Sequence, residues 1–222
     1  MCGRFVRHSS LDLIEKTFNV DTRGIEAAAN YNVAPTQPVL AVIREDQNRL
    51  RRLNWGLVPF WAKDKKIGAR MINARSETVA QKPSFRHAFK KKRCLIIADG
   101  FYEWKGPKGN KQPFFFSPED RRPFGFAGLW DIWKDPESTD YRSCTIITTA
   151  ASDAIRDVHD RMPVILTPDA YDDWLEPANQ DPERLMQILA DKTIRDLMRT
   201  PVSKRVNAVG NNDPQNIEPA VD

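Results

Sequence analysis

The first residues of the chain are Met1-Cys2-Gly3-Arg4, so a cysteine directly follows the initiator methionine. Because the cysteine side chain is small, we expect Met1 to be removed and Cys2 to carry a free α-amine. An α-amine titrates near ~7.7–8.0 and a thiol near ~8.5, so both groups are nucleophilic around neutral pH. Together they form a 1,2-aminothiol: the amine condenses with an aldehyde to an imine, and the thiolate then closes a five-membered thiazolidine ring.

Two other interpretations of Cys2 stay open at this point. Its thiol could attack a carbonyl while its own α-amine serves as base, as in N-terminal nucleophile hydrolases. A cysteine behind the initiator methionine could also be a small, buried residue without any chemistry. The first four residues do not separate these alternatives, so the rest of the chain has to decide.

The length and composition are those of an ordinary globular protein. A chain of 222 residues fits one domain or two small ones, and 41% hydrophobic with 29% charged residues is a typical soluble composition. The longest apolar runs, such as residues 94–98, are far shorter than the ~20 residues of a membrane span. No charged start leads into an apolar stretch, so we expect no signal peptide. Three cysteines imply no disulfide framework and fit a reducing cytoplasm.

Basic residues are concentrated in one part of the chain. The net charge is +4, from 34 Lys and Arg against 30 Asp and Glu. Cations cluster at residues 63–70 and again at residues 82–93, whereas acidic residues gather later. This uneven field suits a phosphate backbone. A solvated helix face that carries surplus lysines is the alternative.

The hydrophobic pattern predicts consecutive strands with few helices. Residues 10–18 have helical spacing behind a serine cap, and Asp181-Pro182 starts another helix with a cap and a first-turn proline. A third helix is expected from Pro83 to Lys91, and a fourth after Thr167-Pro168. The expected strands are residues 3–7, 39–43, 50–55, 94–104, 113–117, 124–130, 144–149 and 164–167, with a hairpin turn at 106–111.

Strands that follow one another without alternating helices indicate an α+β fold with a largely antiparallel sheet. We expect a single domain over residues 1–222. From about Asn207 the tail is polar and interrupted by proline, and we expect it to be extended.

Short motifs along the chain share an order with one known family. They run from Cys2 to Asn207 and read MCGR, YNVAP, WGLVP-x-W, INAR-x-E, ADGFYEW, QPF, TTAA, HDRMP and PVS-x-x-VN. Each motif is weak alone, and the ordered set is specific. At these residues the sequence resembles the SRAP family, the SOS response-associated peptidases or abasic-site processing proteins. The resemblance implies the SRAP fold, with a barrel-like or bifurcated antiparallel sheet flanked by helices.

The resemblance also implies a function and a chemistry. An abasic site exposes a sugar in equilibrium with a ring-opened aldehyde, and the family protects such sites in single-stranded DNA through a thiazolidine on the N-terminal cysteine, here Cys2. Glu103 stands at the family's catalytic glutamate and would shuttle protons during imine formation. His159 matches the family's histidine and would assist opening of the sugar ring. Asn73 would hydrogen-bond the aldehyde or the amine without titrating.

Other matching positions are expected to contact DNA. Arg75 lies two residues after Asn73, so in an extended run both side chains face the same side, and an arginine can grip a phosphate with two hydrogen bonds. Arg4 and Arg161 are expected phosphate contacts, with Asn32 nearby in the pocket. Trp61 and Pro35 are expected to stack on or wedge apart the flanking bases, which tolerates any sequence because every base has a π-face.

Some residues depart from the family pattern or are assigned to the core. Residues 59–62 read Pro-Phe-Trp-Ala, with one tryptophan where some relatives carry two. That difference bears on the DNA wedge and not on the crosslink. The remaining cysteines, Cys94 and Cys144, are expected to be inert core residues. Four tryptophans are also assigned to the core: Trp55, Trp104, Trp130 and Trp133.

The family expectation includes partners and location. We expect a monomer in the cytoplasm, associated with the nucleoid, that binds abasic single-stranded DNA, uses no cofactor and does not contact membranes. Metal catalysis is not expected, because the three histidines and the cysteines show no ligand spacing. Strand cleavage by β-elimination, reversal of the crosslink and peptidase activity on Met1 are expected side activities of the same site.

Two rival functions also fit parts of the sequence. Class II glutamine amidotransferases also begin with Met-Cys-Gly, but they need an oxyanion hole and usually a synthetase domain, for which this chain is too short. A non-catalytic binder of single-stranded DNA would use the basic stretch and Trp61. Replacing Cys2 with alanine separates the two DNA-directed functions, because a plain binder keeps its affinity while a crosslinker loses its stable covalent product.

Overall fold

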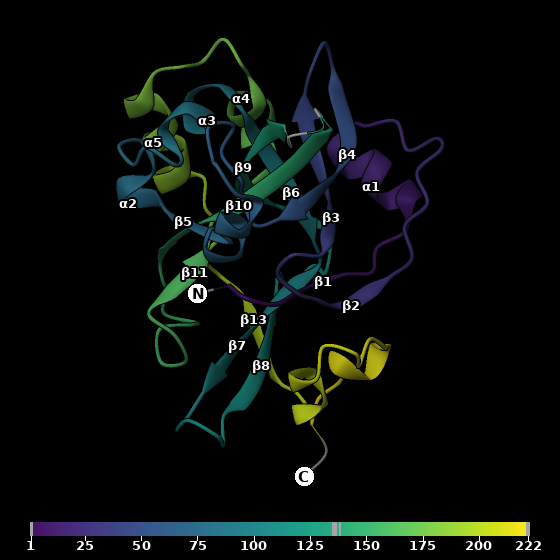
Figure 1. The fold of residues 1–222 in the computed structure, drawn as a ribbon. Helices are drawn as coiled ribbons and strands as arrows, with labels where there is room; N and C mark the ends of the chain where they lie inside the picture. The colour runs from purple at the N-terminus through teal and green to yellow at the C-terminus, as the bar shows by residue number, and fades with distance from the viewer. Residues whose placement is uncertain (1, 135–136, 138, 221–222) are drawn as a thin grey trace.

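The computed structural model describes residues 2–134, 137 and 139–220 and contains two β-sheets flanked by helices (Figure 1). The larger sheet has the strand order β11-β10-β4-β3-β6-β9-β12, and β9 also pairs with β10. That extra pairing closes β10, β4, β3, β6 and β9 into a five-stranded barrel. The strands of the larger sheet are β3 (Pro38–Arg44), β4 (Asn48–Trp55), β5 (Asn73–Arg75), β6 (Arg93–Ala98), β9 (Phe124–Lys134), β10 (Asp140–Ala150), β11 (Arg161–Pro163) and β12 (Ile165–Leu166).

The smaller sheet lies beside the barrel and carries the N-terminus. Its order is β13-β8-β7-β1-β2, so β1 is a central strand and pairs with β7 on one side and β2 on the other. Nearly all pairings are antiparallel; β10 pairs in parallel with β4 and with the short strand β5. The strands are β1 (Phe5–Arg7), β2 (Asn30–Val33), β7 (Gly100–Lys105), β8 (Gln112–Ser117) and β13 (Met198–Pro201).

Strand β3 of the barrel is buried on both faces along most of its length. Along β3, Ala41 and Ile43 belong to the core that fills the barrel and continues to the small sheet, whereas Leu40 and Val42 pack outward against the helices. This alternation follows from side chains that point to opposite faces of a strand. The helices over the outer face are α1 (Leu11–Phe18), α2 (Ser76–Val79), α3 (Arg86–Lys91), α4 (Tyr171–Leu175) and α5 (Pro182–Asp191).

Several predicted elements are confirmed. The helix at 10–18 is α1, where Ser10 caps the first turn by accepting a hydrogen bond from the amide of Leu13. The hairpin from 39 to 55 is β3–β4, and Asp181 caps α5 ahead of Pro182. The α+β class with a largely antiparallel, barrel-like sheet is confirmed as well. Trp55 and Trp133 are buried as predicted, whereas Trp104 and Trp130 are only half-buried.

Three expectations about the elements were wrong. The strand-like run 94–104 is two strands in two different sheets, because Asp99 turns the chain and accepts hydrogen bonds from the amides of His8 and Ser9. The helix expected from Pro83 begins only at Arg86. The tail after Asn207 is folded and not extended. It contains the 3₁₀ turn η4 (Pro214–Asn216), and its residue Pro219 bridges to Val202.

Three further 3₁₀ turns complete the elements: η1 (Lys65–Arg70), η2 (Pro168–Ala170) and η3 (Lys204–Asn207). Among the described residues, none of the helices has the length and apolar character needed to cross a membrane.

Candidate active site

Cys2 lies at the start of the small sheet, three residues before β1, and its side chain is completely buried. The side-chain amide of Asn73 donates a hydrogen bond of 2.8 Å to the carbonyl oxygen of Cys2. Asn73 is the first residue of β5, which pairs with the middle of β10. The barrel therefore supplies the residue that holds the backbone of the N-terminal cysteine.

Asn73 also offers an acceptor at the same place. Its side-chain oxygen Oδ1 is buried and has no hydrogen-bond partner within the described part of the chain. A buried amide oxygen without a partner is costly, and such atoms occur where a ligand is bound. The Asn73 amide can thus hold the Cys2 backbone with its nitrogen and receive a donor from a bound molecule with its oxygen.

Glu103 reaches the same region from β7, the neighbour of β1. Its side chain is only 4% exposed, and this burial raises the pKa of the Glu103 carboxyl. Burial also raises the pKa of the Cys2 thiol, and the negative charge of Glu103 raises that pKa further. The two groups are therefore close enough to influence each other electrostatically, and the Cys2 thiol keeps its proton around neutral pH.

His159 lies on the loop between β10 and β11, and a positive charge on it would lower the pKa of Glu103. Its Nδ1 atom accepts a hydrogen bond of 2.9 Å from the amide of Arg161. The exposed Asp160 carboxylate lies 2.9 Å from the same nitrogen, but that contact needs a proton there. We assign the neutral ring the tautomer with its proton on Nε2, because the Arg161 amide has no alternative to donating.

Arg161 and Arg75 differ in how strongly they are held. Arg161 is 13% exposed and donates to both carboxylate oxygens of Glu77, at 2.6 and 3.0 Å, and to the carbonyl of Thr148 at 2.6 Å. Arg75 is exposed at the end of β5 and forms no ion pair with a described residue. Arg75 is thus the more available of the two for a phosphate.

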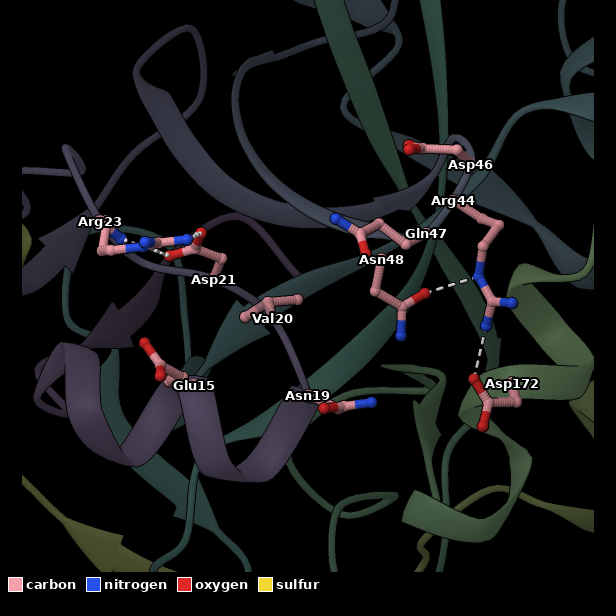
Figure 2. A pocket seen from close by; sticks show the side chains of 10 residues that line it. All are labelled: Glu15, Asn19, Val20, Asp21, Arg23, Arg44, Asp46, Gln47, Asn48 and Asp172. Atoms are coloured by element: carbon pink, nitrogen blue, oxygen red, sulfur yellow. Dashed lines mark hydrogen bonds and ion pairs between the residues drawn. The ribbon is translucent and has the colours of Figure 1, made fainter.

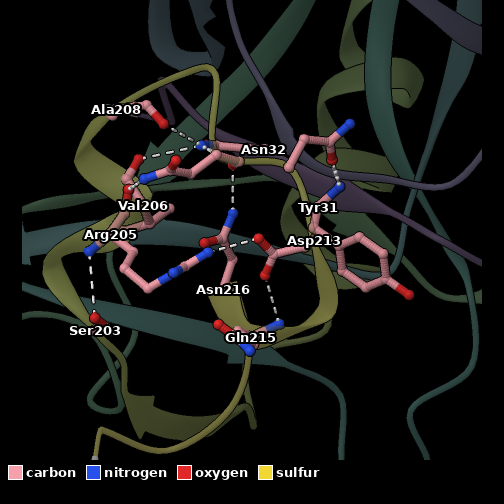
Figure 3. A network of polar contacts seen from close by, with 11 residues as sticks. Tyr31, Asn32, Ser203, Arg205, Val206, Ala208, Asp213, Gln215 and Asn216 are labelled. Carbon is pink, nitrogen blue, oxygen red and sulfur yellow. Dashed lines mark hydrogen bonds and ion pairs between the residues drawn. The ribbon is translucent and has the colours of Figure 1, made fainter.

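Asn32 is built into a polar network with the C-terminal segment (Figure 3), and Arg4 bonds to the same network. Asn32 is 1% exposed; its amide nitrogen donates to the carbonyls of Ala208 and Asn211, at 3.0 and 2.8 Å, and its oxygen accepts from Arg4 at 2.6 Å. Arg4 also donates to the carbonyl of Val206 at 2.9 Å. These intramolecular bonds satisfy the buried amide of Asn32 and hold the half-buried Arg4, and the contact of both residues with DNA stays a prediction.

The expected stacking residues lie on the surface. Trp61 is 48% exposed and its neighbour Phe60 is 53% exposed, in the connection between β4 and β5. Pro35 is half-buried beyond the end of β2, before Thr36, which has a positive φ of 72°. Cys94 and Cys144 are completely buried, and burial raises the pKa of both thiols, as expected for unreactive core cysteines.

A large polar depression of about 680 Å³ lies elsewhere, between α1 and the turn of the β3–β4 hairpin (Figure 2). Both arginines of its lining are paired with carboxylates: Arg44 with Asp172, and Arg23 with Asp21 at 2.6 Å. It contains none of the predicted site residues. Within the described residues, no three His, Cys, Asp or Glu side chains gather as metal ligands would.

A comparison with protein families decides the identity of the chain. A model of the family described as SOS response associated peptidase (SRAP) matches residues 1–209. The chain belongs to the SRAP family. Among its SRAP relatives is YoqW of Bacillus subtilis (strain 168), an abasic site processing protein, 47% identical over 98% of this chain and 99% of its own.

A second relative and a solved structure support the same family and fold. YedK of Escherichia coli (strain K12), also an abasic site processing protein, is 32% identical over 99% of this chain and 100% of its own. A crystal structure of a protein from Bacteroides thetaiotaomicron superposes with a TM-score of 0.87 at 24% identity, covering 99% of this chain and 100% of that one, and thereby shows the same fold.

Sequence reasoning missed two residues that support this SRAP site. Glu77 holds Arg161, and it was visible only as the last letter of the motif INAR-x-E. Asp157 accepts from Lys105 at 2.8 Å and from Arg199 at 2.9 Å, and so fastens the His159 loop to the small sheet. No local signal marks Asp157, because its partners lie 52 and 42 residues away along the chain.

Proposed function

We propose that this chain processes abasic sites in single-stranded DNA by forming a covalent thiazolidine between Cys2 and the ring-opened sugar. The crosslink would protect the site during the response to DNA damage. Its relatives YoqW and YedK are named abasic site processing proteins, which supports the substrate class. The reaction needs a free α-amine, so Met1 must first be removed.

The observation that carries the proposal is the hydrogen bond from Asn73 to the carbonyl of Cys2, beside a buried Glu103. This bond fixes the backbone from which the α-amine projects. The unpartnered Oδ1 of Asn73 is suited to accept a hydrogen from that amine or from a sugar hydroxyl. Positioning an amine beside an electrophile replaces a bimolecular encounter by an effectively unimolecular step.

The bond changes balance as follows. The α-amine adds to the C1′ aldehyde, the resulting carbinolamine loses its hydroxyl as water, and an imine forms. The Cys2 sulfur then adds to the imine carbon, and the thiol proton ends on the ring nitrogen, so the adduct lacks one water relative to its parts. Glu103 is suited to carry these protons, because its raised pKa lets it act as both acid and base.

His159 would act on the sugar before the imine forms. The tautomer with its proton on Nε2 can donate to the ring oxygen as the sugar opens. Ring closure to the thiazolidine removes the imine and thereby suppresses β-elimination, whereas a persistent imine permits strand cleavage. The same proton carriers can open the ring again, so slow reversal is expected, and removal of Met1 by Cys2 itself is the expected peptidase activity.

Intact mass spectrometry tests the proposal directly. The purified protein is measured alone and after mixing with a single-stranded oligonucleotide that contains one abasic site. We expect loss of Met1, followed by a mass equal to protein plus DNA minus one water. The variant Cys2→Ala, with its Met1 removed and this confirmed by its mass, keeps an α-amine but lacks the thiol, so it should give an adduct only after reduction of the imine with borohydride.

The outcomes separate this function from its rivals. Processed wild-type protein that gives no adduct, with or without borohydride, would overturn the proposal and leave plain DNA binding. An adduct equally stable in Cys2→Ala without reduction would exclude the thiazolidine. Release of ammonia from glutamine by the wild type alone would instead favour the amidohydrolase alternative.

A further inference from the structure

The connection between β4 and β5, residues 56–72, leaves the barrel and returns to it at the same place. The amide of Gly56 donates to the carbonyl of Cys144 at 2.8 Å, and the amide of Ile146 donates to the carbonyl of Ile72 at 3.1 Å. Both ends of the connection are thus fastened to neighbouring positions of β10, directly before Asn73. Side chains on this connection are therefore linked through β10 to Asn73 in the candidate active site.

The neck of the connection is closed by two glycines. A Cβ atom on Gly68 would lie 2.6 Å from the carbonyl oxygen of Gly56, so the two segments approach more closely than side chains allow. Gly56 also has a φ of +133°, which other residues rarely adopt. The connection is therefore closed at its base into one compact loop.

Asp131 on β9 fastens this loop beside helix α3. One carboxylate oxygen of the buried Asp131 accepts from the amide of Phe60 at 2.9 Å, and the other accepts from Lys92, just after α3, at 2.6 Å. The Phe60 ring lies 5.2 Å from the ring of His87 on α3. In Figure 1, α3 lies next to β6 and β9, on the side of the molecule where α2 and β5 are drawn.

This arrangement creates what we call the basic face, formed by Phe60, Lys63, Arg86, Lys90 and Lys91, all of them exposed. Arg86 and Lys90 are one helical turn apart, and Lys91 lies one turn after His87, whose ring contacts Phe60. None of the four cations forms an ion pair with any residue that the structure describes.

Some of the cations elsewhere on the molecule are neutralised by carboxylates. Those that pair with a carboxylate within 4 Å include Arg23, Arg44, Arg49, Arg51, Lys105, Lys192, Arg199 and Arg205. Unneutralised neighbouring cations repel one another, and a bound polyanion removes that repulsion. An exposed aromatic ring among them adds a surface on which a base can stack.

We propose that the basic face binds the single-stranded nucleic acid that continues from the abasic site, with phosphates on the α3 cations and a base on Phe60. This inference rests on the proposed function, because it assigns a path to the strand beyond the reacting sugar. A single strand is favoured over a duplex because only unpaired bases leave their faces open to an aromatic side chain.

The salt dependence of DNA binding tests the proposal in the absence of covalent crosslinking. The probes are single strands that carry a tetrahydrofuran residue, which lacks the aldehyde, with flanks of either two or ten nucleotides. A plot of log K against log salt has a negative slope, and each lost phosphate contact reduces the magnitude of that slope by about 0.7. For Lys90→Gln with Lys91→Gln we expect the magnitude of the slope to be smaller by about 1.4 on the long strand only. At 0.1 M salt, the affinity of this variant for the long strand should be about 25-fold lower.

A matched control separates the basic face from general attraction. Lys16 and Lys108 are exposed and unpaired with described residues but lie on α1 and in the β7–β8 turn, so Lys16→Gln with Lys108→Gln removes the same charge elsewhere. The control should bind the long strand as the wild type does. Phe60→Leu keeps an apolar contact to His87 but loses the π-face, and should weaken long-strand binding about fivefold.

The outcomes distinguish this inference from the proposed function. Equal slopes for the α3 variant and the control would overturn the basic face, as would an α3 defect that is the same on short and long strands. Unfolding is checked by the thermal midpoint and by adduct formation on the short abasic strand, which the α3 changes should leave unaltered. A wild type that forms no adduct at all would overturn the proposed function, whereas the slopes still test the face.

Discussion

The ammonium group of Lys105 lies 2.8 Å from the carboxylate of Asp157. Lys105 stands two residues after Glu103 on β7, and Asp157 stands two residues before His159 on the loop behind β10. The ion pair therefore joins the strand of the proposed proton carrier to the loop of the proposed ring-opening acid. Arg199 on β13 adds a second contact to the same carboxylate at 2.9 Å.

This ion pair predicts a role for Asp157 in positioning His159. We expect Asp157→Asn to slow adduct formation about two- to fivefold, a small effect because the pair is exposed, while Asp157→Glu should restore part of the rate. Hydrogen bonds from Lys105 and Arg199 lower the pKa of Asp157 to about 2, from an ordinary value of 3.8. The stabilisation is thus present above pH 3.8 and is lost as the pH falls through about 2.

Single-turnover crosslinking between pH 5 and 8 provides the measurement. Because Asp157 stays ionised over that range, the ratio of wild-type to Asp157→Asn rates should not change with pH. A ratio that varies with pH, or a variant as fast as the wild type, would contradict the positioning role.

We expect the buried Glu103 carboxylate to lower the stability of the folded protein while it speeds crosslinking. Its pKa is raised by burial, so the folded state favours the protonated carboxyl, and stability falls as the pH rises from the ordinary value of 4.5 through the raised one. We expect Glu103→Gln to raise the thermal midpoint at pH 7–8 by roughly 2–4 °C, the effect of about 1 kcal/mol in a chain of this size. The same variant should crosslink at least about 100-fold more slowly.

Thermal unfolding of both proteins at pH 4 and pH 8 checks the stability half of this prediction. The difference should be largest at pH 8 and nearly absent at pH 4, where the wild-type carboxyl is protonated. A Glu103→Gln protein less stable than the wild type at pH 8 would show that Glu103 is needed for packing.

Asn73 should affect the rate of crosslinking more than the affinity for DNA. Asn73→Ala removes the 2.8 Å hydrogen bond to the Cys2 carbonyl and should slow adduct formation about two- to tenfold, as expected for one neutral hydrogen bond. Asn73→Asp has nearly the same size but cannot donate when ionised, so it should be at least as slow. Anisotropy with the aldehyde-free strand should show less than a twofold change, and a rate loss explained by weaker binding would refute the assignment.

Asn32 is predicted to hold the C-terminal segment on the small sheet. Asn32→Ala leaves the carbonyls of Ala208 and Asn211 and a donor of Arg4 without their buried partner. We expect a loss of about 2–3 kcal/mol, which lowers the thermal midpoint by roughly 4–12 °C. Asn212→Ala serves as the control, since Asn212 is exposed and accepts a single hydrogen bond from the amide of Tyr31. Equal midpoints for the two variants would contradict the assignment.

The sequence pattern predicted local structure correctly where residues close together in the chain determine it. The serine cap of α1, the proline start of α5 and the polar turn of the β3–β4 hairpin were all predicted correctly. The run 94–104 was misread because its strand-like composition is the same on both sides of Asp99. Only hydrogen bonds to His8 and Ser9, some ninety residues away, reveal that the chain changes sheets there.

The residue types likewise predicted the chemistry of the site, but they did not predict its geometry. A cysteine behind Met1 defines an aminothiol in any fold, and the ordered motifs identified Asn73, Glu103 and His159 as candidates. Their meeting depends on strand β5 pairing with β10 and strand β7 pairing with β1. Such pairings join distant segments, and no short-range pattern encodes their register.

The sequence by itself therefore determined the reactive groups, the family and the type of fold. Tertiary structure alone decided that Arg4 and Asn32 turn toward the C-terminal segment and that Asp157 fastens the His159 loop. It also left the α3 cations without carboxylate partners among the residues that the structure describes. The physical reason is that hydrogen bonds and ion pairs depend on distances in space. Those distances are set only when the barrel closes and brings segments from opposite ends of the chain together.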